Sequence, residues 1–379
     1  MLFSDIINQA SAKSYLLQSV QQQRISHALL FLAQDGTGGL PLGLAFAQYV
    51  VCTDKNAEGA CGECNQCKKA AQFIHPDIHY SYPVIPRKSG DKPISTDYIR
   101  EWREFIREFP YGNVQDWLQF IGAENKQGNI TANECQDIIH KLSLKSFESE
   151  YKILLLWMPE YLGEQGNRLL KLIEEPPEKT LFILIAEQSE KILSTILSRT
   201  QLVKLSPLSA ADIRTALMSR AQLTEQQANP VANIASGDYR EALQLLQHAN
   251  NDWLHSLRSW LNCLFSGNSK ELQMWIEQIA SAKTGRENQK HFLRYFINLL
   301  EQALRLQYIP PESLHLPPEE ADFAGRLNKI AGWQQLEKIM HELDDACYHI
   351  ERNANAKILF HALSIRLQYI FQNKPLPVY

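Results

Sequence analysis

A glycine-rich turn follows a short apolar run near the start of the chain, and this feature constrains the fold most strongly. Residues 27–32, His-Ala-Leu-Leu-Phe-Leu, are expected to form a buried strand. Residues 35–39, Asp-Gly-Thr-Gly-Gly, then turn the chain into a helix that begins near Pro41. A strand, a glycine-rich turn and a helix N-terminus form the layout of a phosphate-binding loop. The sequence therefore predicts an α/β fold built around a nucleotide-type site.

The loop lacks the side chains that nucleotide hydrolysis requires. When the pattern G-x-x-x-x-G-K-[ST] is laid over residues 33–40, Gly39 stands in place of the lysine and Leu40 in place of the magnesium-binding hydroxyl. The backbone of Gly36, Gly38 and Gly39 can still hold an anion, but no cationic or metal-binding side chain accompanies it. We therefore expect the architecture of an ATPase without its catalysis, and we do not expect ATP as a cofactor.

Four of the seven cysteines are concentrated in one short segment, in the pattern Cys52-x8-Cys61-x2-Cys64-x2-Cys67. Two overlapping C-x-x-C turns with a fourth thiol are typical of tetrahedral zinc, because a tight turn directs both sulfurs at one ion. We expect this zinc to be structural, since four sulfur ligands leave no open position for catalysis. The alternative is a set of free or oxidised thiols. The isolated cysteines, expected to be ordinary buried residues, are Cys135, Cys263 and Cys347.

Nearly continuous apolar runs of strand length recur through the first half of the chain. Besides residues 28–32, these runs are residues 151–157, 180–186 and 201–205. Such runs are typical of strands in a parallel sheet that is covered on both faces. A helix is expected between them, at residues 164–174. The alternation of strands and helices predicts an α/β domain with a mainly parallel sheet.

The hydrophobic pattern divides the chain into three parts. Residues 1–206 are expected to form the α/β domain, with the zinc module at about residues 52–67. Strand signals then stop, and residues 207–250 predict a lid of three short helices, while residues 251–379 predict a helical domain with its own core. An ordinary helical core explains the periodicity of this last part, but surplus apolar positions suit an oligomerisation surface. Examples of these positions are Ile358, Phe360 and Ile365.

Composition and charge exclude several classes of protein. A chain of 379 residues with 45% hydrophobic and 21% charged residues can bury a large core. It contains no run of 18 uncharged apolar residues and no recognisable secretory signal, so we expect a cytoplasmic protein without a membrane span. The formal net charge of -4 argues against a protein that coats nucleic acid, so any DNA contact is expected to be local.

Several stretches of sequence, taken in order, resemble a known family. Residues 167–177 read N-R-L-L-K-L-I-E-E-P-P, and residues 198–201 read S-R-T-Q. Residues 26–31, the four-cysteine module and residues 75–77, His-Pro-Asp, fit the same pattern. Over about its first 250 residues the chain resembles the bacterial AAA+ clamp-loader subunits of DNA polymerase III.

The resemblance implies a role in assembly. It implies an AAA+-like P-loop sheet with an inserted zinc module, followed by a helical lid and an all-α collar domain. It also implies a non-hydrolysing subunit, not an enzyme by itself, that supports ATP-driven loading of a sliding clamp on primed DNA. The implied partners are other loader subunits, gamma/tau and delta, together with the clamp and primer-template DNA, which are reached through the complex.

Residues at the family's catalytic positions agree with a non-hydrolysing member. Counting back from Asn167, the family's magnesium-binding acidic pair falls at Leu156 and Trp157. The resemblance assigns Arg199 to an arginine finger that reaches a neighbouring subunit's ATP, and a surface arginine is the alternative. Arg240 resembles the family's second sensor, in which an arginine faces bound phosphate. Because this chain lacks a competent site, we favour a structural salt bridge for Arg240.

Two other functions stay open at this point. The first is an active gamma/tau-like ATPase subunit with an unusual loop, which nucleotide turnover by the isolated chain would reveal. The second is a zinc-dependent nucleic-acid-binding protein outside replication, which would bind DNA tightly without partners. The role of residues 78–130 is also open, because this segment is longer and more aromatic than the family resemblance leads us to expect.

Overall fold

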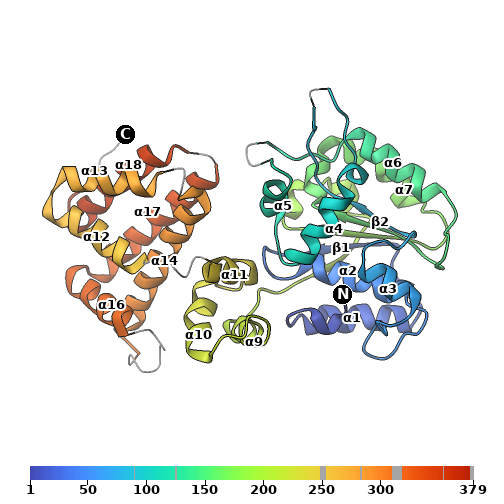
Figure 1. Cartoon of the computed structure of the whole chain (residues 1–379), viewed down its shortest axis with the longest axis horizontal. Helices are drawn as coiled ribbons and strands as arrows, with labels where there is room; N and C mark the ends of the chain where they lie inside the picture. The colour runs from blue at the N-terminus through green and yellow to red at the C-terminus, as the bar shows by residue number, and fades with distance from the viewer. Residues whose placement is uncertain are drawn as a thin grey trace. The chain divides into compact units, whose positions relative to one another are not determined.

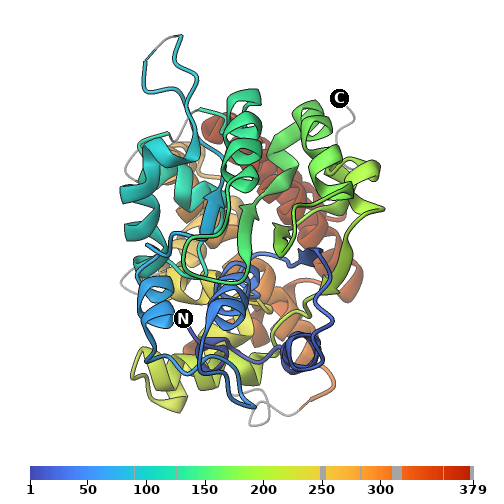
Figure 2. The ribbon, with the colours of Figure 1, turned by 90° about the vertical axis from the view of Figure 1, so that its right-hand side faces the viewer.

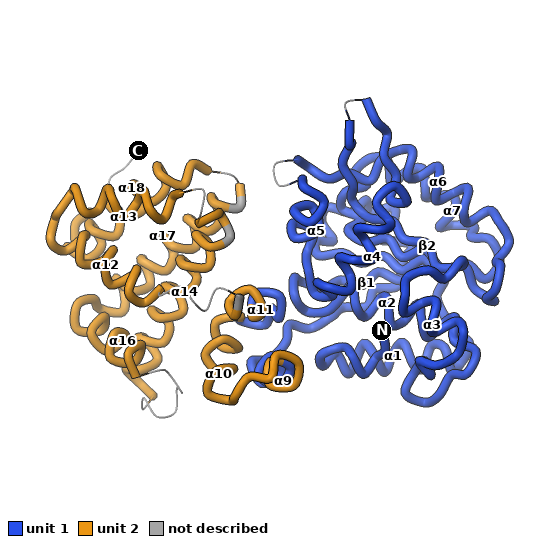
Figure 3. Tube along the Cα trace, viewed as in Figure 1, with its two compact units in different colours: residues 1–216, 236–241 blue, residues 217–235, 242–379 orange. Residues whose placement is uncertain are grey.

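The structure, a computed structural model, describes residues 1–88, 90–123, 126–247, 253–281, 284–309, 318–352 and 354–375. The chain separates into two compact units (Figure 3). Unit 1 contains residues 1–216 and 236–241, and unit 2 contains residues 217–235 and 242–379. The boundary between the units falls inside the predicted lid, so the three-part division at residues 206 and 250 stays a prediction.

Unit 1 is built on a parallel sheet, which has five strands among the described residues, in the order β2-β3-β4-β1-β5. The strands are β1 (Ala28–Leu32), β2 (Ile78–Ser81), β3 (Lys152–Trp157), β4 (Thr180–Ala186) and β5 (Gln201–Lys204). The predicted α/β class and parallel sheet are therefore confirmed. The apolar pattern does not predict β2, because its four residues include His79 and Ser81 and form no apolar run.

Helices cover both faces of this sheet. The helices of unit 1 are α1 (Ala10–Gln21), α2 (Gly39–Val51), α3 (Asn65–Ala71), α4 (Ile99–Glu108), α5 (Val114–Phe120), α6 (Ala132–Ser143), α7 (Leu170–Glu174) and α8 (Ser194–Leu197). Phe31 and Ile183 pack into one core with α1, α2, α4 and α5. Leu30 and Leu184 point to the other face and pack with α6, α7 and α8. Burial on both faces explains the continuous apolar runs.

Two predicted helices differ in detail from the structure. Helix α2 begins at Gly39, two residues before Pro41, because Gly38 adopts the left-handed backbone, with φ 97°, that turns the chain into the helix. The helix predicted at residues 164–174 is instead the end of a 3₁₀ segment, η3 (Pro159–Leu169), followed by the short α7. Gly163 interrupts this 3₁₀ segment with φ 49°.

Residues 82–131, which we call the β2–α6 segment, form an extension of unit 1. Its loop before the 3₁₀ turn η2 (Ser95–Tyr98) projects away from the sheet in two perpendicular views (Figures 1 and 2). Helices α4 and α5 carry an aromatic cluster at its base. Trp102 stacks on Tyr82 at a centroid distance of 4.0 Å and lies 5.2 Å from Trp157 of β3. The cluster therefore fastens the β2–α6 segment to the sheet.

Unit 2 is helical in the part of it that the structure describes. Its helices are α10 (Glu225–Ile234), α12 (Trp253–Ser266), α13 (Ser269–Ile279), α14 (Gly285–Arg305), α16 (Pro318–Ile330), α17 (Trp333–Glu351) and α18 (Ala356–Phe371), while α9 (Ala210–Arg220) and α11 (Tyr239–Gln247) contain the unit boundaries. Trp260 and Trp275 stack at 4.9 Å in its core. Phe360 is buried in this core and cannot contribute to an oligomerisation surface, whereas Ile358 and Ile365 are exposed. No helix among the described residues is long and apolar enough to cross a membrane.

Candidate functional site

The glycine-rich loop joins β1 to α2 at the carboxyl end of β1, where parallel α/β sheets bind ligands. Gly36 and Gly38 take left-handed backbone, with φ of 64° and 97°. Gly39 lies so close to Ala33 that a side-chain Cβ at Gly39 would approach the Ala33 Cβ to 2.6 Å. The lysine that a working loop carries at this position does not fit without rearrangement.

The space beside this loop is small. The cavity has a volume of about 30 Å³, whereas pockets that take drug-sized ligands measure roughly 300–1,000 Å³. Tyr111, Trp157, Met158 and Glu187 line it together with the glycines. Trp157 is the last residue of β3 and Met158 follows it, while Tyr111 comes from the β2–α6 segment. Side chains of the same chain therefore line the small space beside the glycines.

Carboxyl groups surround the loop where phosphate sites carry cations. Burial, with a hydrogen bond to Asp35 and its nearby charge, raises the pKa of Glu187 to about 10. Burial, with the nearby charges of Asp35 and Glu241, raises the pKa of Asp238 to about 6. The Asp238 carboxylate packs on Gly36, where an added Cβ would approach Asp238 Oδ1 to 1.7 Å. At pH 7 the raised pKa keeps Glu187 uncharged, whereas Asp238 is mostly ionised. A phosphate dianion at Gly36 would therefore meet the Asp238 carboxylate, and this like charge disfavours its binding.

The positions of the magnesium-binding acidic pair offer no carboxylate. Leu156 and Trp157 end β3, and both are buried in the cores on either side of the sheet. Glu160, the nearest acid in the sequence, accepts hydrogen bonds from the backbone amides of Glu187 and Gln188 at 2.6 and 2.8 Å. These hydrogen bonds connect Glu160 to the turn after β4, so its carboxylate stabilises that turn.

Arg240 lies beside the loop and forms an ion pair with Asp116. The guanidinium donates through Nε to Asp116 Oδ2 and through Nη2 to Oδ1 at 2.7 Å. Only 9% of the Arg240 side chain is exposed, so this two-pronged pair is largely shielded from water. This is a salt bridge of the kind that we favour for Arg240 from the sequence.

Arg199 follows α8 and is half-buried at the surface of unit 1. Its guanidinium forms an ion pair with Glu174 and donates to the Thr195 carbonyl at 2.8 Å and to the Ser198 hydroxyl at 3.1 Å. The side chain is 34% exposed, so another molecule can reach it. Its proposed action on a neighbouring subunit stays a prediction, because the structure contains one chain.

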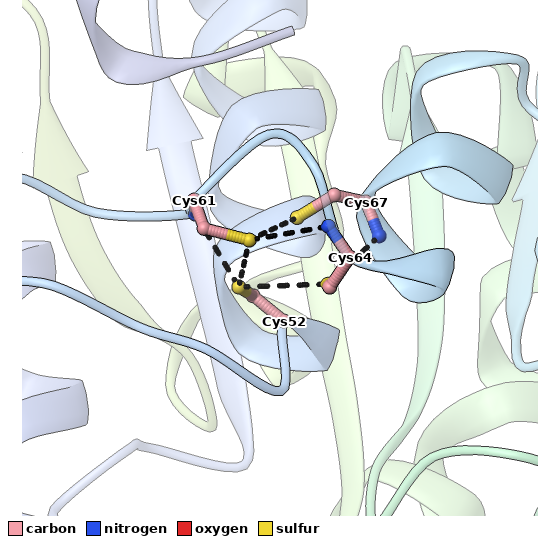
Figure 4. Close-up of side chains that lie close together, drawn as sticks. All are labelled: Cys52, Cys61, Cys64 and Cys67. Carbon is pink, nitrogen blue, oxygen red and sulfur yellow. Dashed lines mark hydrogen bonds between the residues drawn. The ribbon is translucent and has the colours of Figure 1, made fainter.

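The four predicted zinc ligands lie together. All four sulfurs are within 4.8 Å of one another, and the side chains converge from the end of α2 and the start of α3 (Figure 4). Cys52 Sγ lies 3.6 Å from Cys61 Sγ and 3.9 Å from Cys64 Sγ. Sulfurs bound tetrahedrally at ~2.3 Å from zinc would lie about 3.8 Å apart, so the spacing fits one ion.

The backbone prepares the cysteine cluster for a metal. The amides of Cys61, Cys64 and Cys67 each donate to the sulfur of a preceding cysteine at 3.3–3.4 Å. Burial raises the pKa values of Cys52 and Cys67. At Cys64, hydrogen bonds from Thr53 and from the Cys67 amide outweigh burial and lower the pKa to about 5. The thiolate is the form that binds metal ions. The cluster can therefore hold a metal ion, and the three isolated cysteines are buried as predicted.

The sequence prediction missed three residues of the loop environment: Tyr111, Asp116 and Glu187. Glu187 has a usable signal, because it comes directly after β4, at the same edge of the sheet as the glycine loop. The sequence around Asp116 indicates only the start of a helix. The Asp116 carboxylate accepts from the Asn113 amide, and the Asn113 side chain caps α5, which is an ordinary helix start.

The sheet order and the glycine loop after β1 define a class: α/β proteins of the P-loop type. A family model described as DNA polymerase III, delta subunit, matches residues 8–209, which is more than half of the chain. The chain belongs to this family. The resemblance to clamp-loader subunits of DNA polymerase III is thereby confirmed.

Named relatives agree with this family. DNA polymerase III subunit delta' of Bacillus subtilis is 27% identical over 230 residues, which cover 61% of this chain and 56% of that protein. DNA polymerase III subunit delta' of Escherichia coli is 23% identical over 365 residues, covering 94% of this chain and 93% of that protein. DNA polymerase III subunit tau of B. subtilis is 25% identical and is covered over only 37% of its length. The chain thus spans little more than half of the B. subtilis delta' protein.

Proposed function

We propose that this chain is the non-hydrolysing, delta'-like subunit of a DNA polymerase III clamp loader. One observation carries the proposal: the cavity beside the phosphate loop is only about 30 Å³, with Tyr111 and Trp157 in its lining, and the Asp238 carboxylate packs on Gly36. A chain with this loop contributes to ATP-driven loading of the sliding clamp on primed DNA without binding ATP. It is therefore not an enzyme by itself.

Arg199 gives the chain a catalytic part in a neighbouring subunit. An arginine finger is a planar, permanently charged donor that stabilises charge on the transferring phosphate, and it contributes roughly 10³–10⁵ in rate. Arg199 is accessible, and its ion pair with Glu174 is partly exposed to water. Since exposed ion pairs are worth about 0–1 kcal/mol, Glu174 can yield Arg199 to a phosphate of the neighbour at little cost.

The other parts of the chain serve assembly. Cys52, Cys61, Cys64 and Cys67 would hold one structural zinc, whose chemistry is to cross-link the turn between α2 and α3. Residues 207–250 act as a lid and residues 251–379 as a collar that binds the gamma/tau and delta subunits. Exposed apolar side chains of unit 2, including Ile358 and Ile365, suit that contact. The clamp and primer-template DNA are reached through the complex.

The test combines nucleotide binding with reconstitution. Titration calorimetry of the isolated chain with ATP and magnesium should give no heat of binding, and mixing with the other loader subunits should give a stable complex that loads clamps only when this chain is present. Tight magnesium-dependent ATP binding, or turnover by the isolated chain, would contradict the proposal and favour a gamma/tau-like ATPase. Tight DNA binding by the chain alone would favour the zinc-dependent nucleic-acid binder.

A further inference from the structure

Residues 109–116 of the β2–α6 segment enter the phosphate loop's surroundings. Pro110, Tyr111 and Gly112 line the cavity beside the glycines. The Tyr111 ring lies close enough to Gly38 that an added Cβ there would be 3.1 Å from Tyr111 Cε1. Its hydroxyl accepts a hydrogen bond from the Ile7 amide at 2.9 Å. Residues 109–116 are therefore packed against the loop from outside the sheet.

The same residues supply polar partners on both sides of the loop. The Asn113 side-chain amide donates to Asp35 Oδ2 at 2.9 Å, directly before Gly36. Three residues further on, the Asp116 carboxylate accepts both prongs of the Arg240 guanidinium. Arginine presents the same planar fork to a carboxylate as to a phosphate. In this chain, a carboxylate of the protein holds the arginine that flanks the phosphate loop.

Arg240 belongs to the immediate surroundings of the glycines. The Tyr239 amide donates to the Gly36 carbonyl at 3.3 Å, and the Tyr239 ring meets the Tyr111 ring edge-on at 5.0 Å. The residue before Tyr239, Asp238, packs on Gly36. The Arg240 charge also acts on Glu187, which lines the cavity beside the glycines, because it opposes the rise of the Glu187 pKa.

The base of the segment is rigid. Trp102 and Trp117 are fully buried and meet edge-on at 5.3 Å, and the Trp117 indole donates to the Pro83 carbonyl at 2.7 Å. Trp102 and Phe105 also contact Trp157 of β3. Because these rings fasten α4 and α5 to the sheet, they position Tyr111 and Asp116 relative to the sheet.

We propose that residues 109–116 are a built-in occupant of the phosphate-loop pocket, in which the Asp116 carboxylate gives Arg240 the anion that a bound phosphate would otherwise supply. This inference rests on the proposed role as a subunit that binds no ATP, and it explains what stabilises the loop when nucleotide is absent. Removal of Asp116 should take away the carboxylate that accepts both prongs of the Arg240 guanidinium, so that an added anion can take its place.

The experiment uses the isolated full-length chain, with Asp116→Ala as the test and Glu101→Ala as the matched control. Glu101 pairs with Arg87 in the same segment, but that pair is exposed to water. Asp116→Ala should lower the melting temperature by about 5–10 °C, whereas Glu101→Ala should change it by about 1–2 °C. Inorganic phosphate, compared with chloride at equal ionic strength, should raise the melting temperature of Asp116→Ala by clearly more than that of the unmodified chain or the control, which show only the general stabilisation by phosphate.

Hydrogen exchange gives a second readout, in which the amides of Tyr239–Glu241 should lose protection in Asp116→Ala and regain it in phosphate. If Asp116→Ala does not fold, Asp116→Asn keeps the shape and removes the charge, and it should show the same selectivity for phosphate. An unchanged melting temperature, or a loss that phosphate does not selectively restore, would overturn the inference. Neither readout involves loader assembly or Arg199, so failure here is distinct from failure of the proposed function.

Discussion

The Arg199 guanidinium forms an ion pair with the Glu174 carboxylate of the same chain, 25 residues earlier in the sequence. Glu174 ends α7 and Arg199 follows α8, so the pair joins two short helices on one face of the sheet. Both side chains are more than a third exposed, at 34% and 43%. The arginine that we assign to a neighbouring active site is therefore held at the surface by a partner that it can leave.

Substitution of Glu174 should leave the fold intact. Glu174→Gln removes the negative charge and keeps the side-chain length, so the free energy of unfolding should change by less than about 1 kcal/mol. Chemical denaturation measures this, with Glu175→Gln as the neighbouring exposed control. A loss of several kcal/mol would mean that the pair is a structural contact, and it would count against Arg199 being available to another subunit.

Zinc should be bound by the four clustered cysteines and by no other thiol among those described. Elemental analysis of metal-replete protein should give one zinc per chain. Cys64→Ser should weaken or release the ion and loosen residues 50–70, while the sheet, which has its own core, should stay folded. Cys135→Ser, which alters a buried cysteine away from the cluster, should keep the full zinc content. Metal-replete chain without zinc would refute the assignment.

Glu187 should make the stability depend on pH. Its pKa is raised by burial to about 10 in the fold, against 4.5 for the ordinary carboxyl, so the protonated form stabilises the native state. This contribution is complete below about pH 4.5 and is lost as the pH rises towards 10. Glu187→Gln cannot ionise and can still donate to Asp35, so it should be more stable at pH 8 by on the order of 1 kcal/mol.

The measurement is chemical denaturation from pH 5 to 9, a range that lies between the ordinary carboxyl pKa of 4.5 and the native pKa of Glu187, about 10. The unmodified chain should lose stability with rising pH more steeply than Glu187→Gln, and the exposed Glu175→Gln should follow the unmodified chain. Equal slopes for all three chains would show that Glu187 is ionised in the native state at neutral pH, which would contradict its raised pKa.

Restoring the loop signature should not restore activity. In Gly39→Lys with Leu40→Thr, the new lysine meets Ala33 and should destabilise the chain by about 1–3 kcal/mol. Nucleotide turnover should still be absent, because Leu156 and Trp157 replace the acidic pair and the cavity stays small. A steady-state phosphate-release assay checks this, and magnesium-dependent turnover by the double variant would contradict the account.

Local patterns in the sequence predict much of this structure. The apolar run at residues 180–186 has the same first and last residues as strand β4. The cysteine spacing identifies all four clustered sulfurs. Both signals come from residues that lie close together in the sequence. The residues of β4 are all buried by the two faces of the sheet, and the cysteines all converge on one place. The glycine loop is likewise predicted, with its helix starting two residues earlier than expected.

The long-range contacts at the loop are not predictable in this way. Asp116 and Arg240 are separated by 124 residues, and the local sequence around Asp116 indicates only a capped helix start. The place of Tyr111 in the cavity lining depends on how the β2–α6 segment packs on Trp157, which no periodicity encodes. Strand β2 is missed for a related reason, because its place in the sheet comes from pairing with β3 and not from an apolar run.

The most direct test of the central claim is the ATPase rate of a reconstituted loader in which this chain carries Arg199→Ala. Assembly, folding and zinc content should be unchanged, while the rate stimulated by clamp and primed DNA should fall, because one neighbouring site loses a charge that can contribute roughly 10³–10⁵ in rate. Since the other sites keep their arginines, the total loss should be partial. Arg199→Lys should not fully restore the rate, because a point charge does not reproduce the planar fork.

Arg168→Ala, at an exposed arginine of η3, serves as the control and should leave the rate unchanged. The account predicts a loader that assembles normally with Arg199→Ala but hydrolyses ATP and loads clamps more slowly than the loader with the unmodified chain. A loader with Arg199→Ala that works at the unmodified rate would contradict the claim that this chain completes a neighbour's active site.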